Sequence, residues 1–83
     1  DWFHLRRKVA QTFRRVFPEK SRRRVRWYLE IRSDLWEGRK AEAVDKLQQL
    51  HDEISAKARM KNPIASRGPD ALADLLRYLH SNW

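Results

Sequence analysis

Apolar residues recur at steps of three and four along most of this 83-residue chain, and the steps divide it into four segments. A stripe with this period forms one face of an α-helix. The first predicted helix covers residues 2–17, and Pro18 ends it because a proline disfavours the helical conformation of the residue before it. Its stripe comprises Trp2, Leu5, Val9, Phe13, Val16 and Phe17.

The second predicted helix covers residues 20–37. Its start depends on whether Pro18 occupies a first-turn position or Ser21 acts as the N-cap. Gly38 follows the helix and favours a left-handed C-cap. The stripe comprises Val25, Tyr28, Leu29, Ile31, Leu35 and Trp36, with Trp27 on its flank.

Two further helices are predicted at residues 40–61 and 69–81, and neither strands nor internal repeats are indicated. Amphipathic helices must bury their stripes, so we expect one all-α domain, a small bundle of about four helices. The aromatic stripe of the first helix either packs inside this bundle or docks on a neighbour beyond these residues. The third stripe comprises Ala43, Val44, Leu47, Leu50, Ile54 and Ala58, the fourth Leu72, Leu75, Leu76 and Leu79, and the loop between them Asn62, Pro63, Ser66, Gly68 and Pro69.

The composition excludes several classes of protein. Only two glycines and three prolines are present, which disfavours a turn-rich sheet fold, and the absence of cysteine excludes disulfides and thiolate metal sites. No apolar run reaches the ~18 residues of a membrane span, and Arg6, Arg7 and Lys8 interrupt any signal-peptide core. We expect a cytoplasmic protein without membrane contact. The start at Asp1 rather than methionine suggests a piece of a longer protein.

The net charge of +8 lies in the first third of the chain. Residues 1–26 carry ten basic and two acidic side chains, whereas residues 27–83 carry nine of each. A solvated helical face is the ordinary explanation of a charge run, but a field this localised favours a polyanion as partner. We therefore predict that DNA or RNA phosphates are bound by Arg6, Arg7, Lys8, Arg14, Arg15, Arg22, Arg23, Arg24 and Arg26.

Tryptophans near the basic cluster allow two interpretations. Trp27 either stacks on an unpaired base or packs in the core, and its place beside an apolar stripe favours the core. The same interpretation holds for Trp2, Trp36 and Trp83.

Asp1 and His4 form a D-x-x-H pattern at the start of the basic first helix. Taken alone, the pattern has ordinary explanations, because aspartate is a common helix N-cap and the imidazole of His4 is readily half-buried. The histidines at positions 4, 51 and 80 are too scattered to predict a metal triad.

The context of this pattern resembles DDE-type insertion-sequence transposases, in particular the ISKra-like group. Three stretches carry the resemblance, and together they reach from the first residue nearly to the last. Residues 1–7 are similar to the segment around the second catalytic aspartate, and residues 35–39 to an L-W-x-G stretch that joins two helices. Residues 76–82 resemble the R-Y-L-x-x-N stretch that precedes the final catalytic strand and helix.

The resemblance implies a ribonuclease-H-like parent in which three carboxylates hold two Mg²⁺ ions that act on a phosphodiester. Asp1 then corresponds to the second carboxylate and metal ligand, and His4 to its companion. The other two carboxylates have no counterpart, so the chain alone is expected to be inert. It corresponds to a helical insert between the second and third carboxylates that contributes to DNA binding and transposition. The alternatives are a stand-alone basic helical protein that binds nucleic acid and a helical protein-interaction module.

Overall fold

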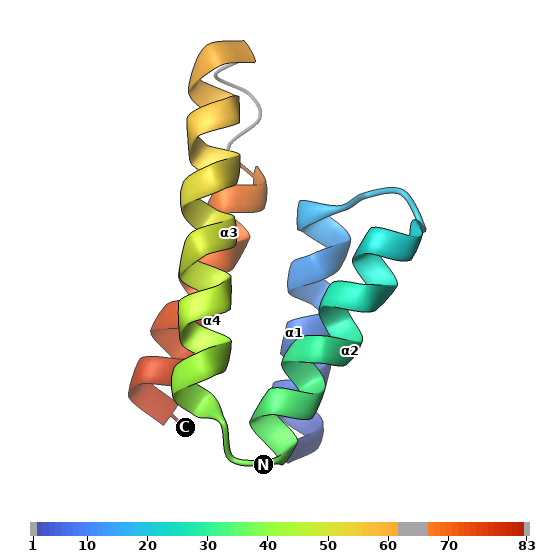
Figure 1. Ribbon diagram of the computed structural model, residues 1–83, viewed down its shortest axis with the longest axis vertical. Helices are drawn as coiled ribbons and strands as arrows, with labels where there is room; N and C mark the ends of the chain where they lie inside the picture. The colour runs from blue at the N-terminus through green and yellow to red at the C-terminus, as the bar shows by residue number, and fades with distance from the viewer. Residues whose placement is uncertain (1, 62–66, 83) are drawn as a thin grey trace.

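The computed structural model describes residues 2–61 and 67–82, and the chain is all-helical over these residues (Figure 1). The four helices are α1 (Trp2–Val16), α2 (Arg22–Trp36), α3 (Lys40–Lys61) and α4 (Arg67–Asn82). The predicted all-α fold is therefore confirmed. Of the predicted loop, Asn62, Pro63 and Ser66 lie outside the described residues, as does the Ala58 side chain, while Gly68 and Pro69 fall in the first turn of α4.

Successive helices run in opposite directions, and α1 and α2 form one pair beside a second pair of α3 and α4 (Figure 1). Helix α1 packs against α2 and α4, and α3 packs against the same two helices. Each helix thus has two neighbours around a shared centre, which is the arrangement of an up-and-down four-helix bundle. The aromatic stripe of α1 is covered within the chain by this packing.

The core lies where the four stripes meet, and it follows the predicted stripes closely in three of the helices. Around it, Trp2, Val16, Phe17, Val44, Ile54 and Leu76 are partly buried. The buried apolar side chains are Leu5, Val9 and Phe13 of α1, Ile31 and Leu35 of α2, Ala43, Leu47 and Leu50 of α3, and Leu72, Leu75 and Leu79 of α4.

Helix α2 departs from the prediction because apolar residues occupy two of its faces. Trp27, Ile31 and Leu35 follow one another at steps of four and face the core, so the core interpretation of Trp27 is confirmed. Val25, Leu29 and Trp36 belong to a second face and are 44%, 46% and 66% exposed. The prediction that these three side chains pack in the core is wrong. Trp83 lies outside the described residues.

Both ends of α2 are capped by local sequence. The Ser21 hydroxyl accepts a hydrogen bond from the Arg24 amide at 3.2 Å, which identifies Ser21 as the N-cap. At the other end, the amides of Gly38 and Arg39 donate to the carbonyls of Leu35 and Asp34 at 3.3 and 2.7 Å. This is the Schellman pattern, and Gly38 adopts the left-handed conformation that it needs, with φ of 81°.

Replacing Gly38 with alanine is expected to lower the free energy of unfolding by about 1 kcal/mol, because a Cβ disfavours positive φ. An added Cβ meets nothing within 4 Å, so no steric clash contributes. Urea denaturation followed by circular dichroism measures the change. Gly68→Ala is the matched control, since its Cβ makes only ordinary contacts of 3.6 and 3.7 Å within a helix. Equal losses in both variants would contradict the argument.

Asp34 connects α2 to α3 from a buried position, with 4% of its surface exposed. Lys46 Nζ lies 2.6 Å from Asp34 Oδ2, and Arg39 Nε lies 3.1 Å from Asp34 Oδ1. Burial favours the neutral carboxyl group, but the hydrogen bonds from Lys46 and Arg39 outweigh burial and lower the pKa of Asp34 below its ordinary value. Lys46 also pairs with Glu30 at 3.0 Å. Both acidic residues of α2 are therefore engaged by α3.

Candidate nucleic-acid interface

The positive charge of the sequence gathers on one pair of helices. Helices α1 and α2 contain ten basic and two acidic residues, whereas α3 and α4 contain seven and six. The two acidic residues of the first pair are Glu30 and Asp34, which pair with Lys46 of α3. The field of the α1 and α2 pair is therefore positive on the side that faces away from α3 and α4.

Part of the exposed surface of this pair, named here the outer face, comprises Phe3, Arg7 and Arg14 of α1 with Arg22, Val25, Arg26 and Leu29 of α2. Arg7 and Arg14 are two helical turns apart, which places them on one side of α1. Arg22 and Arg26 line a shallow apolar hollow together with Val25 and Leu29. Cationic and apolar side chains thus lie next to one another on the outer face.

Four arginines of the outer face have no ion-pair partner among residues 2–61 and 67–82. They are Arg7, Arg14, Arg22 and Arg26, and all four are exposed. A guanidinium group in water keeps its charge at every physiological pH and offers several donors to an anion. The outer face is therefore a ready surface for phosphate groups.

Other basic residues predicted to bind phosphates lie beside groups of the bundle that can attract their charge. Arg24 Nη1 donates to the carbonyl oxygens of Phe17 and Pro18 at 3.4 and 3.5 Å, so Arg24 connects α2 to the turn that follows α1. Arg23 pairs with Glu53 of α3 at 3.8 Å.

Two basic residues of α1 lie beside α4. Lys8 Nζ lies 5.2 Å from the centroid of the Tyr78 ring, and Arg15 lines a hollow with Asp70 and Asp74. Trp27, which was the candidate for base stacking, packs inside the bundle, with its ring centroid 6.0 Å from that of Phe13.

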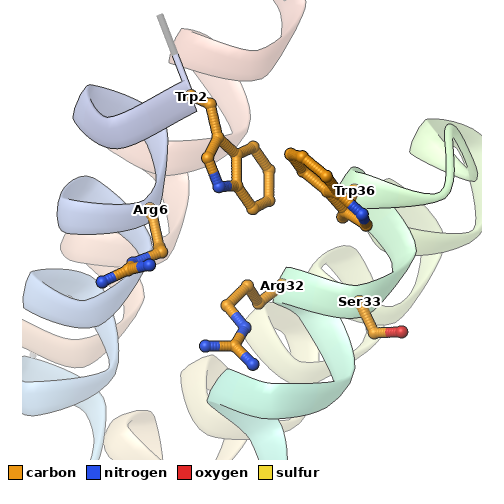
Figure 2. Close-up of a pocket in the computed structure, with 5 residues that line it drawn as sticks. All are labelled: Trp2, Arg6, Arg32, Ser33 and Trp36. Carbon is orange, nitrogen blue, oxygen red and sulfur yellow. The ribbon is translucent and has the colours of Figure 1, made fainter.

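A second feature lies where the start of α1 meets the end of α2. A hollow of about 360 Å³, named here the indole pocket, is lined by Trp2, Arg6, Arg32, Ser33 and Trp36 (Figure 2). The two indole rings lie 4.9 Å apart between centroids and are tilted by 56°. Arg6 and Arg32 come from different helices and lie on the same side of the indole pair in Figure 2.

Sequence reasoning missed Arg32 and the exposure of Trp36. The charge excess was assigned to residues 1–26, and Arg32 lies beyond them among residues of balanced charge. The spacing of Arg32 and Trp36, four residues apart on one helix, was the available signal. The two residues on α1 that complete the pocket, Trp2 and Arg6, share the same spacing.

The structure describes only part of the D-x-x-H pattern, because Asp1 lies outside the described residues. His4 is exposed on the first turn of α1, and its ring lies 5.8 Å from that of Tyr78 of α4. No group of three metal-ligating side chains occurs among the residues that the structure describes. Residues 37–39 lie between α2 and α3.

Comparison with protein-family models, with curated proteins and with solved structures finds no match to this chain. No helix among the described residues has the length and apolar character needed to cross a membrane.

Proposed function

We propose that this chain binds nucleic acid through the outer face of α1 and α2. The observation that carries the proposal is the set of four exposed arginines without ion-pair partners, on a helix pair whose acidic residues are engaged by α3. Guanidinium groups on phosphates release condensed counterions, which makes binding favourable, dependent on salt and largely independent of sequence.

The double variant Arg22→Ala with Arg26→Ala is expected to weaken binding to a short DNA duplex. The slope of log K against log salt should become shallower by about 2, since each phosphate contact contributes about 0.9. Fluorescence anisotropy over a range of salt concentrations measures both quantities. Arg24 is left in place because its guanidinium group donates to carbonyl oxygens of the turn between α1 and α2.

The control removes two positive charges from the opposite pair of helices. Lys57 and Arg77 are exposed on α3 and α4, and they pair with Glu53 and Asp74. The Lys57→Ala with Arg77→Ala variant should keep the salt slope of the unmodified protein. If both double variants lower the slope equally, the protein responds to net charge alone and the outer face is not the binding surface.

Exposed apolar residues support a second candidate, a protein-interaction module. Val25 and Leu29 are exposed and line one hollow with Arg22 and Arg26. Burial of these side chains against a protein partner would persist at high salt, whereas phosphate contacts weaken as salt rises. A salt titration of any complex that the chain forms therefore separates the two candidates.

We further propose that the chain is part of a DDE-type transposase that acts on DNA in the cytoplasm. The support is the resemblance of residues 1–7, 35–39 and 76–82 to such enzymes. In this proposal Asp1 contributes one of three carboxylates for Mg²⁺, His4 accompanies it, and the chain alone stays inert. Sequencing the flanking DNA tests the proposal: an open frame with an upstream Asp and a downstream Glu supports it, and close stop codons on both sides contradict it.

A further inference from the structure

The indole pocket combines an exposed indole ring with two positive charges. Trp36 is 66% exposed, although burial of an indole in the bundle core would stabilise the fold. Arg6 and Arg32 line the same hollow as this ring, and none of the described residues that line it carries a carboxylate. The pocket therefore presents an aromatic surface beside two positive charges.

Each property indicates one part of a ligand. Two guanidinium groups that line one hollow attract an anion, most effectively a phosphate whose several oxygens accept hydrogen bonds from both. The exposed indole offers a flat π-surface for a planar ring, and stacking on it requires a base that is not paired within a duplex. Phosphate and unpaired base are joined in a nucleotide of a single strand.

We propose that the indole pocket binds one unpaired nucleotide of a single-stranded nucleic acid. The base stacks on Trp36, and the adjoining phosphate lies between Arg6 and Arg32. Trp2 supports Trp36 from α1 at a ring distance of 4.9 Å and holds it in place for stacking. This inference rests on the proposed function and specifies it, because the outer-face arginines contact the backbone of any strand, while the pocket distinguishes single strands from duplexes.

The test compares a short fluorescein-labelled oligothymidine with the same strand annealed to its complement, at low salt, by fluorescence anisotropy. Trp36→Ala should weaken oligothymidine binding by about 5- to 100-fold and leave duplex binding within about twofold, because only the single strand stacks. Trp36→Phe retains an aromatic face and should recover most of the lost affinity. Circular dichroism of each variant checks the helical content.

A second variant tests the phosphate part without altering the indole pair. Arg32→Gln removes one guanidinium charge and should weaken oligothymidine binding more than duplex binding. Equal losses for strand and duplex, or no loss for either, in both Trp36→Ala and Arg32→Gln would overturn the nucleotide pocket. If Arg22→Ala with Arg26→Ala still weakens binding in that case, the proposed function stands without the pocket. Absence of salt-sensitive binding of both probes by the unmodified protein would overturn the proposed function and this inference with it.

Discussion

Replacing Phe13 with alanine is expected to lower the free energy of unfolding by about 3–5 kcal/mol. The Phe13 side chain is 1% exposed, at the junction of α1 with its neighbours, and its ring lies 6.0 Å from Trp27 of α2 and 6.4 Å from Phe17. Alanine would remove these contacts and leave a cavity that the helices close only in part.

The loss is large in relation to the whole domain. A chain of this length has a total stability of about 4–12 kcal/mol. The Phe13→Ala variant should therefore unfold at a much lower urea concentration and lose near-ultraviolet circular dichroism first. Phe3→Ala is the matched control, because Phe3 is the same residue type on the same helix and is 74% exposed. Similar midpoints for the two variants would contradict the observed core.

Replacing Asp34 with alanine is expected to cost about 2 kcal/mol of unfolding free energy. The carboxylate accepts hydrogen bonds from two cations, and such charge-assisted bonds contribute more than neutral ones. The effect stays moderate because Arg39 and Lys46 are 46% and 35% exposed and regain water when Asp34 is lost. Urea denaturation at neutral pH measures the change, with exposed Asp45→Ala expected to stay within about 0.5 kcal/mol of the unmodified protein.

The same ion pairs give the stability a dependence on pH. The pKa of Asp34 is lowered in the folded state, so its contribution is fully present above the unfolded pKa of about 3.9. It is lost as the pH falls through the lower folded pKa, where the buried carboxyl group takes up a proton. Asp34→Asn should therefore lose less stability than the unmodified protein between neutral pH and pH values below about 4. Parallel losses in the two proteins would show that Asp34 does not contribute to acid unfolding.

The helices themselves could be predicted from the sequence because their apolar stripes are regular and their ends carry capping residues. Leu72, Leu75 and Leu79 have one period and one buried face, and they pack as predicted. Gly38 ends α2 for a local reason, since its left-handed conformation closes hydrogen bonds within five residues. Features that depend on a few neighbouring residues are the ones that periodicity and capping rules describe.

Features that depend on the neighbouring helices could not be predicted in this way. Val25 and Leu29 fit an apolar stripe as well as Ile31 does, and only the position of α3 and α1 decides which of the two faces of α2 is buried. Arg24 belongs to a run of arginines that look alike in sequence. Its hydrogen bonds to Phe17 and Pro18 depend on the turn between α1 and α2.

The candidate site shows the same division between local and tertiary information. Counting charges located the basic first third of the chain and five of the arginines that remain accessible, namely Arg6, Arg7, Arg14, Arg22 and Arg26. It did not find the indole pocket, because Trp2 and Trp36 are 34 positions apart in the chain and meet only when α1 and α2 pack antiparallel.

The unequal charge of the two helix pairs also has a kinetic consequence. The excess positive charge lies on α1 and α2, and the charges of α3 and α4 nearly balance, so the molecule has an electric dipole that points from the second helix pair toward the first. In the field of a polyanion such a molecule rotates during its approach, so that collisions occur preferentially with the outer face already turned toward the target. Electrostatic steering of this kind raises association rates by about 10- to 1000-fold at low ionic strength, and added salt removes the gain.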